Sequence, residues 1–405
     1  MRKLLLVLLL TTTLNAQERV LFIGNSYTAA NSLPTMVATI ASSANQSLAC
    51  SQQTLGGATL YQHSQSNATY TRLASQNWDY VVLQAQSQEP SFPYGQFSWQ
   101  TLPYAIELVD SIRSIAPCAQ PVFFRTWGRE NGDQANCAVF PPLCTYEGMD
   151  SMLHRHYSLM ADTTDSYLSP VGTVWKHIRD TDSTINLYTS DGSHPSLAGT
   201  YAAACTFFTM ITRMDPNTIT DDQNLNPGVA AAIRQAAKDV VYDSLAAWDV
   251  GLYDTQAGFT ATMAFDTLTY TDTSIYADSI YYDFGDSNYS SIPNGTHVYG
   301  QNDLFTITQY AYRCGSVDTT SIVVQSVVLF DINEQQQEIV NLKQLDQFWP
   351  PNLQSVKLYS LDGKLCWSSQ RSNTSNLPDD LPRILVLVAT WDNGLRTRQR
   401  YFSKQ

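Results

Sequence analysis

Apolar runs of strand length alternate with helical patterns over roughly residues 19–245, and this alternation constrains the fold more than any other feature. The predicted strands are Val20–Gly24, Asp79–Gln84 and Pro121–Thr126. The predicted helices, chosen by apolar period and length, are Pro34–Ala44, Leu102–Ser114, Glu147–Ala161, Leu197–Thr212 and Gly228–Leu245. Such alternation predicts an α/β domain with a parallel sheet and helices on both faces. Ligands of such sheets bind beyond the carboxyl ends of the strands.

The first 16 residues, MRKLLLVLLLTTTLNA, have the pattern of a secretory signal peptide. Arg2 and Lys3 precede the short apolar run Leu4–Leu10, and the small residue Ala16 ends the segment. This run is too short to span a bilayer, and no later run of about 18 apolar residues exists. We therefore expect a protein that is secreted or held at the cell surface, without a transmembrane segment.

The formal net charge of the chain is −13. Nucleic acids and anionic membrane surfaces are bound by clustered cations, so this charge argues against both partners. Asp-rich loops between residues 266 and 286 carry oxygen ligands of the kind calcium accepts, but surface solvation is the preferred interpretation. No metal ion and no organic cofactor is expected.

The chain contains seven cysteines, so at least one thiol is expected to be free. Cys137 and Cys144 lie close together in the Pro-rich stretch NCAVFPPLCTY and are the best disulfide candidates. Their spacing lacks the paired CxxC pattern of a structural zinc site. Cys205 lies in an apolar helical stretch, where a buried and unreactive thiol is expected.

After about residue 250 the helical pattern gives way to short Tyr-, Thr-, Ile- and Val-rich runs between turn residues, which predicts all-β domains. The expected boundaries are 17–250 for the α/β domain, 251–327 for a β-sandwich and 328–405 for a further β-rich segment. The sandwich resembles a PKD-type immunoglobulin-like module around YDFGD at Tyr282–Asp286. The stretches VKLYSLDGKL and RILVLVATWDNGLRTRQRYF resemble the C-terminal sorting domains of Bacteroidota proteins exported by the type IX system, although one more sandwich hairpin is an alternative.

Two motifs within the α/β domain can supply a nucleophile and its base. Ser26 follows the first predicted strand, and Asp191 and His194 lie three residues apart in the loop DGSHPS. A carboxylate that accepts from one ring nitrogen leaves the other free to activate a hydroxyl, as in serine hydrolases. Either motif alone is more often a turn or a capping loop, so their positions at the two ends of one domain are what favour catalysis. Pro195 is expected to open the following helix.

This arrangement resembles the SGNH (GDSL-type) hydrolase superfamily over roughly residues 18–245. FIGNSYT resembles the first sequence block, with Asn25 where Asp is usual; LGGATL resembles the second and DGSHPS the fifth. The resemblance implies a three-layer, flavodoxin-like sheet and a Ser26–His194–Asp191 triad. It also implies an oxyanion hole formed by the backbone N–H groups of Ser26 and Gly57, with the neighbouring Gly56 as another possible register.

The third block of the family, normally Gly-x-Asn-Asp, is altered in this chain. Counting without gaps from Asp79, the Asn donor of the family falls on Gln88 and the Gly on Gln86. Gln88 is therefore the first candidate for the side-chain donor and Gln86 the second. The alternative is that both glutamines only form hydrogen bonds within their own loop. Trp127 and Arg129 follow a strand at the same edge and are candidates for the substrate pocket, although a core Trp and an ion-paired Arg are equally compatible. His63 follows the second block and can face the site, although a lone His is more often a surface or loop residue.

These patterns predict a secreted serine esterase that needs no cofactor. Export and the PKD-like module favour an acylated polysaccharide as substrate, with removal of O-acetyl groups as the expected reaction. One alternative is an esterase or lipase that acts on lipid or small acyl esters. A second alternative is a catalytically silent surface protein that binds carbohydrate. The C-terminal segment of this chain would engage the secretion machinery.

Overall fold

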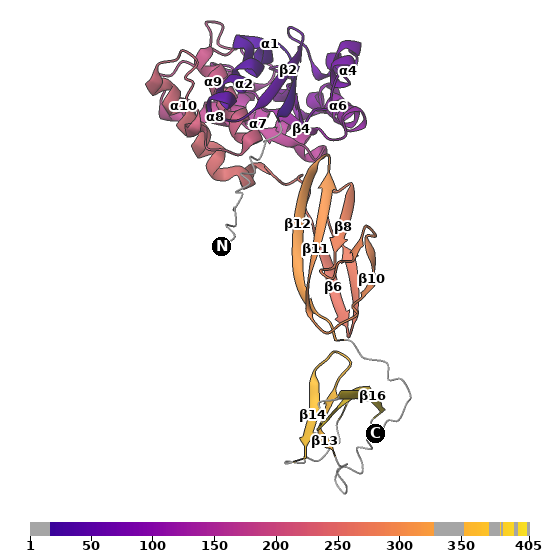
Figure 1. Cartoon of the computed structure of the whole chain (residues 1–405). Coiled ribbons are helices and arrows are strands. Elements are labelled where there is room, and N and C mark those ends of the chain that lie inside the picture. The colour runs from indigo at the N-terminus through magenta and orange to yellow at the C-terminus, as the bar shows by residue number, and fades with distance from the viewer. Residues whose placement is uncertain (1–16, 328–351, 372–380, 382–383, 393–395, 403–405) are drawn as a thin grey trace. The chain divides into compact units, whose positions relative to one another are not determined.

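The computed structural model describes residues 17–327, 352–371, 381, 384–392 and 396–402 (Figure 1). The predicted signal peptide lies outside these residues. The chain divides into two compact units, one that ends at Tyr253 and one that begins at Asp254. In the part of the chain that the structure describes, no helix combines the length and apolarity that a bilayer crossing requires.

The first unit is built on a five-stranded sheet with the order β2-β1-β3-β4-β5. Its strands are β1 (Glu18–Gly24), β2 (Leu48–Thr54), β3 (Tyr80–Leu83), β4 (Gln120–Phe124) and β5 (Tyr167–Ser169). All neighbouring pairs are parallel. This is the flavodoxin-like order, so the expected parallel α/β sheet is confirmed. Winding reverses between β1 and β3, and such a switch point is where ligands bind in this architecture.

Helices cover both faces of this sheet. They are α1 (Ser26–Ala29), α2 (Leu33–Ser43), α3 (Leu60–Ser64), α4 (Asn67–Leu73), α5 (Tyr94–Gln100), α6 (Leu102–Ile115), α7 (Tyr146–Thr163), α8 (Val171–Thr181), α9 (Leu197–Thr212) and α10 (Pro227–Val240). Alternate residues of β1 enter different cores. Phe22 packs with α2, α8, α9 and α10, whereas Leu21 and Ile23 pack with helices α3 to α7. Burial on both faces explains why the strands are continuous apolar runs.

Several elements of this unit differ from the sequence-based expectation. Strands β2 and β5 were not predicted, because β2 is a polar edge strand and β5 has only three residues. Helices α3, α4, α5 and α8 were also not predicted. Helix α10 ends at Val240 and is followed by a 3-10 segment, Tyr242–Trp248, where one longer helix was expected. Pro195 does not open α9, because Ser196 caps that helix and Pro195 precedes the cap.

The second unit contains antiparallel sheets, as the all-β pattern predicted. Its strands are β6 (Phe259–Ala264), β7 (Thr267–Asp272), β8 (Ser279–Asp283), β9 (Tyr289–Ser290), β10 (Asn294–Val298), β11 (Leu304–Arg313) and β12 (Ser316–Gln325). They form sheets of order β10-β7-β6 and β12-β11-β8-β9 around a shared core. Tyr282 and Phe284 of the YDFGD stretch are buried there. At Gly285 (φ 79°) a side chain would meet the backbone of Thr306.

A further antiparallel sheet follows, with the order β14-β13-β15-β16. Its strands are β13 (Leu353–Tyr359), β14 (Leu365–Gln370), β15 (Ile384–Trp391) and β16 (Arg396–Phe402). Buried residues such as Val356, Leu358 and Leu387 form the core of this sheet. A sorting role for this segment stays a prediction.

The predicted disulfide between Cys137 and Cys144 is present, seven residues apart in sequence. Cys205 is a free, fully buried thiol whose pKa is raised to about 12 by that burial. A thiol with so high a pKa holds almost no thiolate at neutral pH, which agrees with the unreactive role expected for it.

Candidate active site

Ser26 lies immediately beyond the carboxyl end of β1, on the first turn of α1. Asn25 precedes it as the cap of α1, and its Oδ1 accepts from the backbone N–H of Tyr27 at 3.0 Å. The Asn25 amide nitrogen donates to the carbonyl of Ala58 at 3.1 Å. A carboxylate at this position could not donate that second bond. Asn25 therefore joins the turn at residues 24–28, called the serine turn below, to the loop that holds Gly57.

Two buried polar side chains, Gln84 and His63, hold this turn through hydrogen bonds. The Oε1 atom of Gln84 accepts from the Asn25 backbone N–H at 2.9 Å and from the Thr28 hydroxyl at 3.0 Å. His63 is buried and lies 2.9 Å from the Gly24 carbonyl through Nε2 and 3.1 Å from the Thr69 hydroxyl through Nδ1. Burial lowers the pKa of His63, partly opposed by the Gly24 carbonyl. A neutral ring that donates from Nε2 and accepts at Nδ1 satisfies both contacts.

The structure brings Ser26, His194 and Asp191 together into one chain of hydrogen bonds. The Oγ of Ser26 lies 2.8 Å from Nε2 of His194. On the other side of the ring, Nδ1 lies 2.5 Å from Oδ2 of Asp191. This is the order in which an imidazole can take a proton from a hydroxyl while a carboxylate orients it.

The loop that carries Asp191 and His194 is closed by local contacts. Oδ1 of Asp191 accepts from the backbone N–H groups of Ser193 and His194, both at 2.9 Å, and from the Thr189 hydroxyl at 2.8 Å. Gly192 adopts φ 65°, which permits the tight turn. Desolvation opposes ionisation of Asp191, but hydrogen bonds from His194 and from these groups outweigh it and hold its pKa well below the ordinary value. Asp191 is therefore ionised at neutral pH.

A stack of aromatic rings supports this loop. Tyr27 meets His194 edge-on, and its hydroxyl lies 2.5 Å from Oγ of Ser193. Trp127 is covered on one side by Tyr27 and on the other by Trp175, with interplanar angles of 3° and 2°. Its Nε1 donates to the Ser193 carbonyl at 3.1 Å. Trp127 is only 1% exposed, so it cannot offer a face to a sugar and instead positions the histidine loop.

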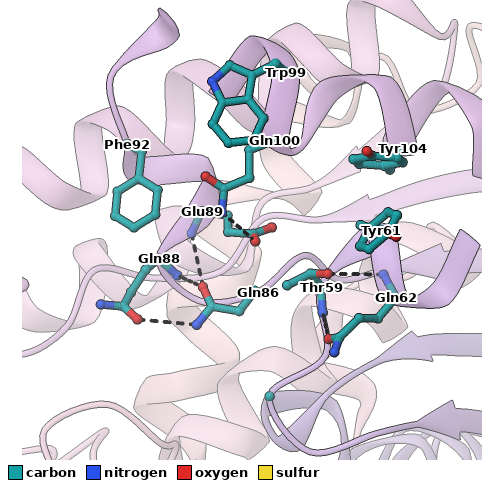
Figure 2. A pocket seen from close by; sticks show the side chains of 11 residues that line it. Thr59, Tyr61, Gln62, Gln86, Gln88, Glu89, Phe92, Trp99, Gln100 and Tyr104 are labelled. Atoms are coloured by element: carbon teal, nitrogen blue, oxygen red, sulfur yellow. Dashed lines mark hydrogen bonds between the residues drawn. The ribbon is translucent and has the colours of Figure 1, made fainter. Parts of the chain in front are cut away.

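Gly57, Gln86 and Gln88 line a common cavity of about 660 Å³ (Figure 2). Gly57 adopts φ 66°, in the left-handed region that favours glycine. Oε1 of Gln86 accepts from the backbone N–H groups of Gln88 and Glu89, and its Nε2 lies 3.3 Å from Oε1 of Gln88. The Gln88 amide nitrogen donates to Asp133 at 2.6 Å, and an amide carries a second N–H.

Asp133 joins the loops after β3 and β4. Its carboxylate is fully buried and accepts from Gln88, from Asn136 at 2.6 Å and from Arg129 at 3.2 Å. Arg129 thus forms the ion pair that the sequence left open as an alternative to substrate binding. Asn136 adjoins the Cys137–Cys144 disulfide, which closes the same loop.

Sequence reasoning missed three residues that support the site: Gln84, His63 and Asp133. The sequence leaves His63 either facing the site or in a surface loop and does not predict its buried supporting role, and no local pattern marks Gln84 or Asp133 as buried hydrogen-bonding groups. Each role depends on a contact between distant positions. Gln84 and Asn25 are 59 residues apart, His63 and Gly24 are 39 apart, and Asp133 and Gln88 are 45 apart. Among the described residues, no cluster of three or more His, Cys, Asp or Glu side chains is arranged to hold a metal ion.

No family model and no curated protein matches this chain. Solved structures do show similarity. A DUF4886 family protein from Bacteroides uniformis is 19% identical, aligned over 57% of this chain and 95% of its own, with a TM-score of 0.49. A protein from Slackia heliotrinireducens, provisionally assigned as an SGNH hydrolase, is 25% identical over 47% of this chain and 97% of its own, with a TM-score of 0.39. The PKD1 domain of the Vibrio cholerae metalloprotease PrtV is 20% identical over 18% of this chain and 98% of its own, with a TM-score of 0.18.

Proposed function

We propose that this protein is a serine hydrolase of carboxylic esters. The observation that carries the proposal is the continuous hydrogen-bonded chain from Ser26 through His194 to Asp191, built at the switch point of the sheet. The three residues come from two segments more than 160 positions apart, so local turn formation does not explain why they meet. The resemblance of the surrounding motifs to the SGNH superfamily supports the same reaction class.

The geometry fits a two-step acyl transfer. Oγ of Ser26 attacks the ester carbonyl carbon while Nε2 of His194 takes the hydroxyl proton. The tetrahedral intermediate then collapses, its C–O bond breaks, and His194 returns the proton to the departing alcohol. Water, activated by the same nitrogen, hydrolyses the acyl-serine and releases the carboxylic acid. Asp191 stays ionised and stabilises the imidazolium that forms in each step.

The negative charge on the carbonyl oxygen is assigned to the backbone N–H groups of Ser26 and Gly57 and to the side-chain amide of Gln88, with Gln86 as the alternative. One such donor contributes about 3 kcal/mol to transition-state stabilisation. Bonds to the loop fix both amides, so the choice of Gln88 rests on its alignment with the family's Asn, and its bond to Asp133 holds it in place.

The substrate that we propose is an O-acetylated polysaccharide outside the cell. Support comes from the signal-peptide pattern at the N-terminus and from the antiparallel sheets that accompany the α/β unit. The alternative of a silent carbohydrate-binding protein is disfavoured by the intact hydrogen-bonded chain, since a binding surface does not require a serine, histidine and aspartate in that order.

Labelling with a fluorophosphonate probe tests the assignment directly. We expect the wild-type protein to be labelled, and Ser26→Ala and His194→Ala to lose labelling while keeping the wild-type circular dichroism spectrum. Ser111→Ala is the matched control, because the Ser111 hydroxyl donates to the Glu107 carbonyl within α6, away from the triad. Persistent labelling of Ser26→Ala would falsify the proposal.

A further inference from the structure

The cavity beside Gly57 and Gln88 is larger than an acetyl ester requires and has a mixed lining. Its volume of about 660 Å³ lies within the range of ~300–1,000 Å³ usual for pockets that enclose small molecules. Eleven residues line it: Gly57, Thr59, Tyr61, Gln62, Gln86, Gln88, Glu89, Phe92, Trp99, Gln100 and Tyr104. They include residues of the loop after β3 and of helices α3, α5 and α6, so the cavity extends from the proposed oxyanion donors towards these helices.

Aromatic rings stand at the rim of this cavity. Trp99 is 65% exposed and Tyr61 is 49% exposed. Each lies on a helix that is anchored by a fully buried side chain, Phe97 on α5 and Leu60 on α3. Tyr104 lies beside Tyr61, with ring centroids 4.8 Å apart. Figure 2 shows Tyr61 and Tyr104 on the side of the cavity opposite Phe92. The chain thus leaves large flat apolar surfaces in solvent on well-anchored elements.

Side-chain amides and one carboxylate lie between these rings. Gln62 caps α3 through its Oε1 atom, which leaves its NH₂ group for other partners. Gln100 donates to Glu89 at 3.0 Å and accepts from Gln96 at 2.8 Å. Glu89 is buried, and none of the residues that line the cavity is Lys, Arg or His. The cavity therefore offers hydrogen-bonding groups but no cation.

We propose that this cavity binds uncharged sugar residues of the acylated glycan, with Trp99 and Tyr61 as stacking platforms and Gln62 as a partner for hydroxyl groups. This inference rests on the proposed function. A pyranose ring has an apolar C–H face and a rim of hydroxyls, which matches flat aromatic rings interleaved with amides. The glycan would lie across α3 and α5 and present its ester to the end of the cavity formed by Gly57 and Gln88.

Other ligand classes fit this lining less well. A long acyl chain would cover amide groups such as the NH₂ of Gln62 without replacing their hydrogen bonds to water, which costs free energy. A uronate or sulfated sugar would bring a negative charge next to Glu89 with no cation to balance it. The neutral glycan is thus the occupant that satisfies both the rings and the polar groups.

The test compares a large and a small substrate in the full-length protein. We expect Trp99→Ala and Tyr61→Ala to lower kcat/KM on acetylated neutral glycans by about tenfold, the equivalent of one lost stacking contact. The same variants should hydrolyse 4-nitrophenyl acetate within twofold of wild type. Tyr94→Ala is the matched control, because Tyr94 is an exposed aromatic residue on α5 that does not line the cavity.

A binding measurement separates this inference from the proposed function. Ser26→Ala is titrated with xylan, mannan and glucan oligosaccharides free of O-acetyl groups, with N-acetylated chitin oligosaccharides and with polygalacturonate. Each titration is repeated in the double variant that also carries Trp99→Ala. Binding of a neutral oligosaccharide that is weakened by Trp99→Ala supports the cavity assignment even if no ester is hydrolysed. The assignment would be overturned if no neutral glycan binds or if polygalacturonate binds more tightly. It would also be overturned if Trp99→Ala in the active enzyme lowers activity only on long-chain 4-nitrophenyl esters.

Discussion

The two halves of the proposed site are held in place in different ways. The serine half, from Gly24 to Thr28, rests on side chains inside the fold, since Gln84 and His63 are both almost fully buried. The histidine half, the loop from Thr189 to Ser196, lies at the surface: the side chains of His194 and Asp191 are 42% and 48% exposed. Asp191 is held mainly by hydrogen bonds within its own loop.

Contacts made by Tyr27 and Asn31 help to connect the halves. Tyr27 reaches Ser193 with its hydroxyl, and the side-chain amide of Asn31 donates to Thr200 at 2.8 Å and to the carbonyls of Pro195 and Ser196. Removing a buried side chain that supports the serine half, such as His63, should lower stability more than activity, whereas removing a side chain of the histidine half should lower activity most. The following predictions test that difference.

Asp191→Asn carries the largest expected loss, a fall in kcat of about 10⁴-fold on 4-nitrophenyl acetate, because an amide favours the wrong tautomer of His194. Asp191 has a folded pKa below its unfolded value of about 3.9. Its contribution to stability is therefore present at neutral pH and is lost as the pH falls below about 4 towards the folded pKa. Urea unfolding should show a difference between wild type and Asp191→Asn at pH 7 that shrinks in acid.

Asp180→Asn is the matched control for that variant, because Asp180 is an exposed carboxylate that pairs with Lys176 on its own helix. It should retain wild-type activity. A loss of less than tenfold in Asp191→Asn would argue that the loop carboxylate does not orient His194.

Gln88→Ala should lower kcat by about 10²–10³-fold with little change in KM, since an oxyanion donor acts mainly in the transition state. The melting temperature should change little, because Gln88 is part-exposed and Asp133 keeps bonds from Arg129 and Asn136. Gln86→Ala is the comparison variant. If Gln86→Ala loses more kcat than Gln88→Ala, the donor has been assigned to the wrong glutamine.

His63→Ala should have the smallest effect on activity, about tenfold, but should destabilise the protein by about 3 kcal/mol through a cavity and lost hydrogen bonds. Burial keeps the folded pKa of His63 below its unfolded value of about 6.5. Wild-type stability should therefore decrease as the pH falls below about 6.5, because the unfolded state takes up a proton first. His63→Ala should lack this component.

Chemical unfolding of the wild type and of His63→Ala between pH 5 and 8 measures this pH-dependent part of the stability. His177→Ala serves as the control, because His177 is part-exposed and its ring lies 3.6 Å from Asp239 at the surface. Equal destabilisation by His63→Ala and His177→Ala would contradict the role of buried His63 as a support of the serine half.

Much of this architecture could be predicted because its signals are local. The apolar runs at Val20–Gly24 and Pro121–Thr126 marked strands β1 and β4, and helix α9 has the predicted bounds Leu197–Thr212. The edge strands β2 and β5 were missed because partial burial and short length remove the apolar signal. The sequence left Trp127 either in the substrate pocket or in the core, because position alone does not reveal that two other rings cover it.

The sequence by itself determined the parallel α/β sheet, the all-β segments after it, the Cys137–Cys144 pairing and the three residues of the candidate triad, because periodicity, spacing and motif chemistry are local properties. Only the tertiary structure decided that Ser26 reaches His194, that His63 and Gln84 hold the serine turn, and that Asp133 holds Gln88. Those contacts join segments far apart in the chain. The sheet order sets β1 between β2 and β3, and β3 beside β4, so the ends of these strands and the segments that follow them meet. Packing of α9 against the β1 face brings the loop of His194 to Ser26.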